Sequence, residues 1–192
     1  EACGTTVLQT DHEDAQGQYE INFLHAEALA SADRLMLFKL AAHALAEARG
    51  MVLSMMPKPF ADQPGSGMHW HVSLWDGAHN LFAGSDGALS ALGRAFVAGV
   101  LAHAPALAAI GAPTVNSYKR LRVGRSRSGT SWAPAFVAHG ANNRTALVRT
   151  LPDRLEWRLP DAAANPYLVT ATLIAAGLDG IDRGLDPGPG ID

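Results

Sequence analysis

Cysteine is almost absent from this sequence, which has a single thiol, Cys3, among its 192 residues. One thiol excludes a disulfide within the chain and a thiolate metal cluster, and it fits a reducing compartment, so we expect a cytoplasmic protein. Long apolar runs are missing as well. The sequence has no stretch of about 18 apolar residues and no signal peptide, and it therefore predicts no membrane-spanning segment.

Charge is also scarce, with 15 Lys and Arg against 18 Asp and Glu and a net charge of -3. This balance gives no reason to expect nucleic acid or an anionic membrane as a partner. A hydrophobic share of 48% beside 17% charged residues is typical of a folded chain and argues against disorder. The first residue is Glu1 and the last stretch, DPGPGID, is loop-like, so we expect a fragment of a longer protein.

The order of local patterns predicts an antiparallel α+β layer structure, because strand patterns are interspersed with a few long helices and no internal repeat is visible. Residues 5–24 are predicted to be extended, with a turn near Gly17. Helices are predicted for residues 31–49, 87–103 and 165–177, with Ser31 and Asn165 as N-caps. Strands are predicted for residues 51–57, 68–75, 133–138, 145–151 and 154–159, and a basic, Ser/Gly-rich loop for residues 114–131.

The stretch GSGMHWHVSLW, residues 65–75, alternates two kinds of side chain. In a strand, His69, His71 and Ser73 share one face, and the apolar residues between them share the other. The apolar face is predicted to lie on the core. The opposite face carries two imidazoles and a hydroxyl, which suits a polar cleft.

Residues 154–159 repeat this arrangement, with Arg154, Glu156 and Arg158 on one face and apolar residues on the other. Two strands that each turn ionisable groups to one side would form the floor of a polar site. The alternative is a sheet with one solvated face, which is common among antiparallel sheets.

An acidic segment, DHEDAQGQYE, holds Glu13 and Glu20 on either side of Gly17. A straight strand would send two residues seven apart to opposite faces, whereas a turn at Gly17 brings both carboxylates to one point. Two carboxylates at one point suit a hard divalent cation with oxygen ligands. The alternative is a solvated acidic loop.

Four arginines, Arg120, Arg144, Arg149 and Arg158, stand close to Asn, Gly or Pro rather than inside charged helix faces. Guanidinium groups bind carboxylate and phosphate at two points. Together with the carboxylates and histidines, they indicate phosphoryl chemistry with Mg²⁺. No Gly-rich Walker loop is present, which argues against a P-loop, and a zinc site at the two histidines of residues 65–75 would lack a third nitrogen or sulfur ligand.

Four motifs then stand in the same order as in the glutamine synthetase family: KPF(x)₄GSGMHWHVSL, NSYKRL, NNRTALVR and RLEWRLPDAAANPYL…AAGLDGI. The chain resembles the main part of that family's catalytic domain over nearly its whole length. The resemblance implies an α+β fold, with a mainly antiparallel sheet and flanking long helices, in which residues 1–192 form part of one catalytic domain. The family's N-terminal β-grasp domain, early Glu-x-Glu metal motif and C-terminal helical part would be absent.

The resemblance implies two divalent ions per site, Mg²⁺ or Mn²⁺. Glu13 and Glu20 would hold one ion, and His69 and Glu156 the other. His71 would lie near the phosphates of ATP and Ser73 near its adenine.

The resemblance also assigns the substrate contacts. Gly65 would approach the amino group of glutamate with its backbone, Arg120 would bind the α-carboxylate, and Arg158 the side-chain carboxylate. Arg144 and Arg149 would hold the transferring phosphoryl group and the ATP phosphates, and Arg144 would also contact glutamate. Catalytic roles fall to Arg144, Glu156 and Arg158.

The family's reaction makes γ-glutamyl phosphate from ATP and glutamate, and ammonia or another amine then displaces phosphate. Family members form rings of subunits, commonly dodecamers, which we expect for the intact protein. A catalytically silent, structural family member should have lost metal ligands or arginines, and this sequence keeps all that it can contain. The isolated fragment is expected to be inactive, because half of each metal site would be missing.

One segment departs from the family pattern. Ammonia-using members follow NSYKRL with a flap of the form VPGYEAP, whereas this chain reads RVGRSRSGTSWAP, with Ser126 near the place of the flap glutamate. No acidic residue lies between Arg120 and Asp153, so ammonium should bind less well. Trp132 favours a larger amine through apolar and cation–π contact. The segment resembles the glutamate–methylamine ligase branch, and Pro64 is a second departure, near the expected glutamate contacts.

Overall fold

The computed structural model describes residues 4–126, 129–130 and 132–191 of the chain. Ten strands and five helices follow one another in this part. They are β1 (Val7–His12), β2 (Tyr19–Phe23), α1 (Ala28–Glu47), β3 (Trp70–Val72), β4 (Trp75–Asp76), β5 (His79–Asn80), α2 (Ala91–Ala102), α3 (Ala104–Gly111), α4 (Val115–Arg120), β6 (Arg125–Ser126), β7 (Gly129–Thr130), β8 (His139–Ala141), β9 (Val148–Leu151), β10 (Arg154–Trp157) and α5 (Pro166–Asp182).

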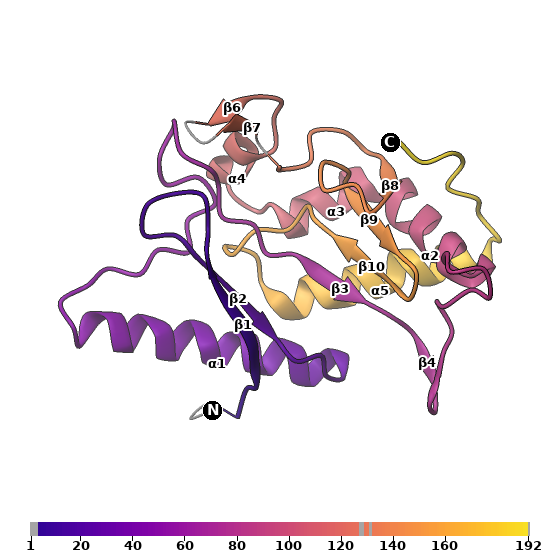
Figure 1. The fold of residues 1–192 in the computed structure, drawn as a ribbon, viewed down its shortest axis with the longest axis horizontal. Coiled ribbons are helices and arrows are strands. Elements are labelled where there is room, and N and C mark those ends of the chain that lie inside the picture. The colour runs from indigo at the N-terminus through magenta and orange to yellow at the C-terminus, as the bar shows by residue number, and fades with distance from the viewer. Residues whose placement is uncertain (1–3, 127–128, 131, 192) are drawn as a thin grey trace.

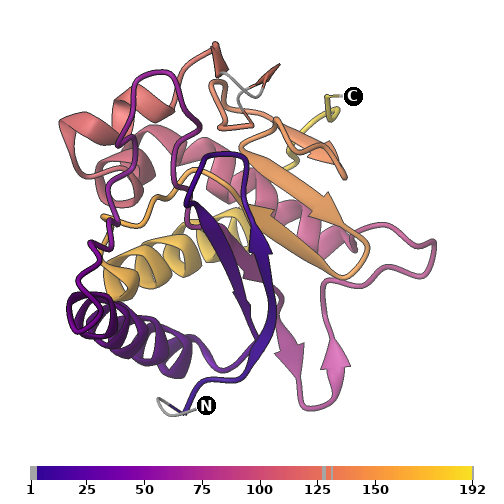
Figure 2. The ribbon, with the colours of Figure 1, turned by 60° about the vertical axis from the view of Figure 1, so that its left-hand side comes forward.

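A four-stranded sheet with the order β3-β10-β9-β8 forms the centre (Figure 1). The β3–β10 and β10–β9 pairs are antiparallel and the β8–β9 pair is parallel. Figure 2 shows the β1–β2 hairpin standing in front of β3, with α5 behind it. The fold is therefore of the α+β class with a mainly antiparallel sheet, as the sequence predicted.

The core lies between this sheet and helices α2 and α5. Leu155 and Trp157 of β10 are fully buried against Phe96 of α2 and Leu173 of α5. The even-numbered apolar residues of the 68–75 stretch pack against the same core. The alternation predicted for both strands is thus confirmed, and it leaves the opposite face of the sheet to the polar side chains.

Helices α2 and α5 approach so closely that their backbones touch. A Cβ atom on Gly99 would lie 2.1 Å from the carbonyl oxygen of Ala176, and one on Gly180 would lie 2.2 Å from that of Ala95. The ring of Phe96 occupies the space beside Gly177 in the same way, at 2.2 Å. Gly177 is therefore an interior helix residue, and α5 continues past the end predicted there.

Polar contacts join helix α1 to the loop after β10 and to α5. Lys39 Nζ donates to the carbonyl oxygens of Ala162, at 2.6 Å, and Ala164, at 3.2 Å. The Tyr167 hydroxyl donates to the Asp33 carboxylate at 2.6 Å. Ala32 alone among the residues of α1 is buried, and several leucines face outward: Leu29, Leu37, Leu40 and Leu45.

Several element predictions were wrong for identifiable reasons. Residues 51–57 form no strand because no neighbouring strand pairs with them, and Val52 is 95% exposed. Residues 133–138 form no strand either, and β8 begins only at His139. Pro134 lacks the backbone N–H that a central strand needs. Helix α1 begins at Ala28, so Ser31 lies inside it and donates to the Ala26 carbonyl instead of capping.

The segment predicted as a loop contains helix α4. Thr114 and Ser117 form a reciprocal capping box at its start, which satisfies the first backbone N–H groups. The predicted helix of residues 87–103 ends at Ala102, and α3 follows at once with a proline in its first turn. No single helix in the described ranges is long and apolar enough to cross a membrane, and α2 and α3 satisfy that test only as a pair bent by 74°.

The helix contact gives the first testable prediction. We expect Gly99→Ala to lower the free energy of unfolding by about 2 kcal/mol, because the added methyl group meets backbone atoms that cannot rotate away. The greater helix propensity of alanine offsets only about 1 kcal/mol of the packing penalty. Thermal unfolding of the purified chain measures the effect. Gly124→Ala is the matched control, since a Cβ there meets nothing within 4 Å, and equal melting temperatures for the two variants would contradict the packing account.

Candidate functional site

Glu156 is the centre of the polar face of the sheet. It lies on β10, opposite His71 of β3 on one side and Arg149 of β9 on the other. Its carboxylate is 2% exposed. His69 Nδ1 lies 3.1 Å from Oε1, Arg149 Nη1 lies 2.8 Å from Oε2, and Arg158 Nη1 donates to Oε1.

These neighbours determine the charge of the cluster. Burial acts to raise the pKa of Glu156, but the hydrogen bond from His69 and the positive charge of Arg158 outweigh it and hold the pKa well below its usual range. Burial lowers the pKa of His69, which favours the neutral imidazole. The cluster thus contains one carboxylate, two guanidinium groups and a neutral histidine. Its net charge is positive, so it attracts anions.

The arginine side chains are held in fixed orientations. Arg149 donates from Nε and Nη2 to Asn142 Oδ1, at 3.0 and 2.5 Å, in addition to its contact with Glu156. Asn142 has the left-handed φ of 52° that its place in the β8–β9 turn requires. The Arg144 side chain is exposed in the same turn, and its charge contributes to the lowered pKa of the buried Arg158.

Arg158 has one buried nitrogen without a hydrogen-bond partner in the described part of the chain. Its Nη2 donates to the carbonyl of Trp132 at 3.2 Å, and its Nη1 is engaged by Glu156. Its Nε–H is buried and has no partner within the part of the chain that the structure describes. A buried donor without a partner costs free energy, which an anionic ligand would recover.

The acidic turn lies over this cluster. The β1–β2 hairpin turns at Gly17, with φ of 73°, and a hydrogen bond joins Glu13 to Glu20. Burial and this hydrogen bond raise the pKa of Glu13, while the bond lowers that of Glu20. The pair therefore retains one proton more readily than two separate carboxylates would. The charges of His69 and Glu156 act on Glu20, so the turn brings the two predicted carboxylates together, next to the sheet residues.

The residues present fit a divalent cation only in part. The chain offers a carboxylate pair, Glu13 with Glu20, and a histidine–carboxylate pair, His69 with Glu156. Within the described residues no group of three His, Cys, Asp or Glu side chains could hold a metal ion. Each pair would thus need ligands from outside this chain to complete a coordination shell.

Arg120 is buried, and its guanidinium group already has hydrogen-bond partners within the chain. It is 4% exposed, and its guanidinium donates to the carbonyl oxygens of Arg158, Leu159 and Pro160 at 2.9, 3.0 and 3.1 Å. Burial lowers its pKa to about 10. A Cβ on Gly65 would lie 2.8 Å from Arg120 Cγ, so glycine is needed where the 65–68 segment crosses this arginine.

The remaining predicted residues lie along β3 and just beyond it. His71 is exposed, and its Nδ1 accepts a hydrogen bond from Arg154 Nε at 3.3 Å. The Ser73 hydroxyl accepts one from Trp75 Nε1 at 2.8 Å. His71 is the cross-strand neighbour of Glu156, and Ser73 lies past the end of β3, farther from the arginines.

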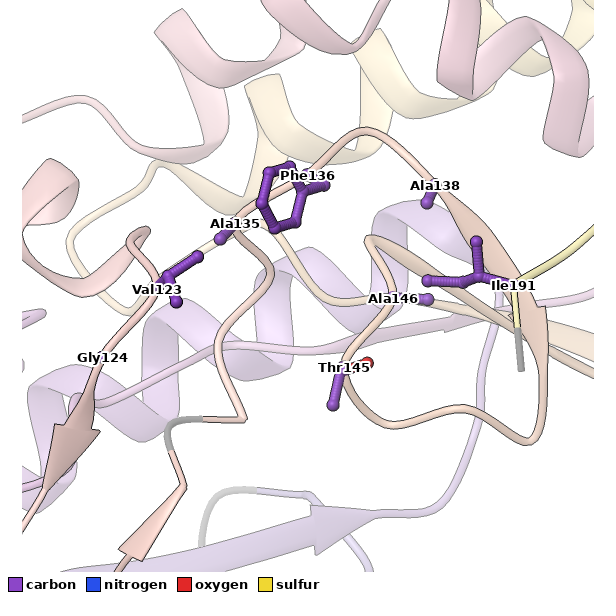
Figure 3. A pocket seen from close by; sticks show the side chains of 8 residues that line it. All are labelled: Val123, Gly124, Ala135, Phe136, Ala138, Thr145, Ala146 and Ile191. Carbon is purple, nitrogen blue, oxygen red and sulfur yellow. The ribbon is translucent and has the colours of Figure 1, made fainter.

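A separate cavity of about 200 Å³ lies between the residues just before β6 and the β8–β9 turn (Figure 3). None of the predicted site residues line it. Its walls are apolar except for the Thr145 hydroxyl, next in sequence to Arg144, and consist of Val123, Gly124, Ala135, Phe136, Ala138, Thr145, Ala146 and Ile191.

Sequence reasoning missed three residues that shape the site. Asn142 orients Arg149, and its only signal was the Asn-Asn pair beside Arg144. Gln18 Nε2 joins the acidic turn to the Gly65 carbonyl at 3.1 Å, and no local pattern marks it. Asp161 is fully buried behind Arg120 in a stretch whose pattern indicates only a helix start.

The comparisons with known proteins agree with this geometry. A family model described as glutamine synthetase, catalytic domain, matches residues 1–192. A glutamate–methylamine ligase of Methyloversatilis universalis is 52% identical over 191 residues, covering 97% of this chain and 43% of that protein. A glutamine synthetase of Rhizobium leguminosarum bv. phaseoli is 49% identical over 194 residues, covering 98% and 45%.

Solved structures show the same likeness. A GmaS/ADP complex superposes with a TM-score of 0.91 at 45% identity, over 100% of this chain and 45% of that one. Apo GmaS without ligand gives a TM-score of 0.85. The chain spans less than half the length of these relatives.

The centre of the cluster gives the second prediction. We expect Glu156→Gln to lower the free energy of unfolding by about 3 kcal/mol, because Arg149 and Arg158 then remain buried without a counter-charge. Chemical denaturation at low salt measures this loss. Asp153→Asn removes an exposed carboxylate from its pair with Arg154 and is expected to cost about 0.5 kcal/mol or less. Similar losses in both variants would mean that Glu156 is an ordinary surface acid.

Proposed function

Since the chain belongs to the glutamine synthetase family, over the part that forms its catalytic domain, we propose that the full-length protein is an ATP-dependent ligase. It joins an amine, ammonia or a small alkylamine, to the γ-carboxyl group of glutamate. The observation that carries this proposal is the Glu156-centred cluster, in which arginines with an excess of positive charge converge on a buried carboxylate.

Phosphoryl transfer is the first step of the proposed reaction. A γ-carboxylate oxygen of glutamate attacks the γ-phosphorus of ATP, the bond to ADP breaks, and γ-glutamyl phosphate forms. Arg144 and Arg149 hold the transferring group and the ATP phosphates, whose negative charge spreads in the transition state. Asn142 and Glu156 hold the Arg149 guanidinium in place before substrate arrives, so little reorganisation is needed.

Glutamate binding requires two cationic groups, one for each carboxylate. Arg158, with its unpaired Nε–H, takes the side-chain carboxylate. Arg120 has five N–H donors, of which the carbonyls of residues 158–160 use three, and the remaining ones take the α-carboxylate. The backbone at Gly65 approaches the amino group.

Two divalent ions, Mg²⁺ or Mn²⁺, complete the proposed site and would neutralise phosphate charge when bound. Glu13 and Glu20 would hold one and His69 and Glu156 the other, with further ligands from outside this chain. His71 lies near the ATP phosphates and Ser73 near the adenine. A cytoplasmic ring of identical subunits is the proposed setting of the intact protein.

Amine transfer is the second step. The amine nitrogen attacks the carbonyl carbon of γ-glutamyl phosphate, the bond from that carbon to the phosphate oxygen breaks, phosphate leaves, and the nitrogen loses a proton to solvent. The second candidate function is a glutamate–methylamine ligase, or a ligase for another alkylamine or a polyamine. Two observations favour it: residues 121–152 contain no carboxylate to bind ammonium, and the relative that is 52% identical is a glutamate–methylamine ligase.

Trp132 is the residue that links the second candidate to the geometry. Its carbonyl accepts from Arg158, so its backbone lies beside the proposed position of the reacting carboxylate. Its indole is 51% exposed and therefore available for an alkyl group. The Ser126 side chain, which stands near the place of the family's flap glutamate, lies outside the described side chains.

An amine panel tests the choice between the two. We expect the full-length protein to release phosphate from ATP only with Mg²⁺ or Mn²⁺ and glutamate present, and to show a higher kcat/KM with methylamine than with ammonia. A higher kcat/KM with ammonia would establish a glutamine synthetase and remove the specificity role of the 125–134 segment. Absence of glutamate-dependent phosphate release with every amine would contradict the proposed function itself.

Arg149→Lys tests the phosphoryl role. Lysine keeps the charge but loses the fork that contacts Asn142 and Glu156 together, so we expect kcat to fall about 10²-fold with little change in the KM for glutamate. Arg94→Lys is the matched control, because Arg94 is an exposed arginine paired with Asp186 outside the cluster. Steady-state phosphate release measures both, and equal rates for the two variants would exclude Arg149 from the phosphoryl site.

A further inference from the structure

Asp161 is a buried carboxylate that the proposed reaction does not use. It follows β10 closely and is fully inaccessible to solvent. Its Oδ1 accepts from the Ala163 backbone N–H at 3.0 Å, and burial raises the pKa of the carboxyl group while the nearby Ser117 hydroxyl acts to lower it. Its Oδ2 has no hydrogen-bond partner among residues 4–126, 129–130 and 132–191.

Two buried or half-buried cations reach the loop that carries this carboxylate. Arg120 of α4 donates to backbone carbonyls of residues 158–160 and Lys39 of α1 to those of Ala162 and Ala164, and no ion pair in the described part of the chain joins either cation to Asp161. Burial lowers the pKa of Arg120 and of Lys39. The negative charge of Asp161 acts in the opposite direction on both. A buried cation without a carboxylate nearby is costly, so Asp161 stabilises Arg120 in its charged, inward position.

The position of Arg120 in turn fixes the substrate-facing residues. Its three carbonyl contacts run from Arg158 to Pro160, directly behind the Arg158 side chain. Asp161 also forms a β-bridge with Gly67, and the Met68 N–H donates to the Pro160 carbonyl at 2.9 Å. The same loop therefore supports the Arg158 end of β10 and the glycine segment that precedes His69.

We propose that Asp161 is a positioning residue for the dicarboxylate substrate: as the buried carboxylate of the loop to which Arg120 is hydrogen-bonded, it holds the two glutamate-facing arginines at their mutual spacing. This inference rests on the proposed function, because it assigns Arg120 and Arg158 to the two ends of one glutamate molecule. The ATP-facing residues Arg144 and Arg149 lie in another turn and on another strand, and Arg149 is held by Asn142 as well as by Glu156, so we expect them to depend less on Asp161.

The test is Asp161→Asn in the full-length protein. The amide has nearly the same size and keeps the acceptor for the Ala163 N–H, but it removes the charge that faces Arg120. We expect the KM for glutamate to rise about tenfold, with the KM for ATP within about twofold of the wild type. Lys39→Met is the matched control: it removes the other cation beside the same carboxylate and should lower the melting temperature while leaving the KM for glutamate unchanged.

Each outcome decides the inference. A selective rise in the KM for glutamate supports it, whereas an unchanged value, or an equal rise in both KM values, overturns it. If Asp161→Asn does not fold, Ser117→Ala decides, with Thr114→Ala as its control: both variants lose the capping box of α4, but only Ser117→Ala removes the hydroxyl group beside the Asp161 carboxyl group. A rise of about threefold in the glutamate KM alone then supports the inference, and no rise overturns it. A wild-type protein without glutamate-dependent phosphate release removes the proposed function and this inference together, while an active wild type with an unchanged Asp161→Asn variant removes only the latter.

Discussion

The buried Glu156 carboxylate is the interaction on which the site depends. It draws His69, Arg149 and Arg158 from three neighbouring strands or their extensions to one point, and it stays ionised because these donors outweigh the effect of burial. A single buried acid could not be maintained alone. The surplus of guanidinium groups around it makes this face of the sheet positive, which is the electrostatic requirement for holding phosphate and carboxylate groups side by side.

The second constraint is that protein hydrogen bonds hold the arginine side chains in fixed positions. Arg120 is tied to three consecutive carbonyls, Arg149 to Asn142, and Arg158 to the carbonyl of Trp132, so their side chains lose little freedom when a ligand binds. The acidic turn with Glu13 and Glu20 lies close to His69 and Glu156, whose charges act on Glu20. Burial and the hydrogen bond to Glu20 raise the pKa of Glu13, so the two carboxyl groups are crowded here, and a divalent ion would relieve that crowding. Because each candidate metal pair lacks further ligands in this chain, the site is built from more than these residues.

Sequence patterns predicted the site floor better than the peripheral elements. Period-two alternation placed His69 and Glu156 on one face because both belong to strands whose other face is buried, and burial enforces register. The turn at Gly17 was predictable for a similar reason, since a glycine with positive φ permits a tight reversal. Residues 51–57 and 133–138 were misassigned because apolar content alone does not supply a pairing partner. Arg120 was predicted to bind the α-carboxylate of glutamate. Its carbonyl contacts join a helix to a loop about 40 residues away, which no local pattern reveals.

The central claim is that this cluster activates the γ-carboxylate of glutamate by phosphorylation. The most direct measurement follows oxygen from substrate to product. The full-length protein would be given ATP, Mg²⁺, methylamine and glutamate labelled with ¹⁸O in its carboxylates, and the released phosphate analysed by mass spectrometry. An acyl phosphate route transfers one labelled oxygen into phosphate, which is the result predicted here. Phosphate released without label would show that the carboxylate never bonds to phosphorus and would contradict the account.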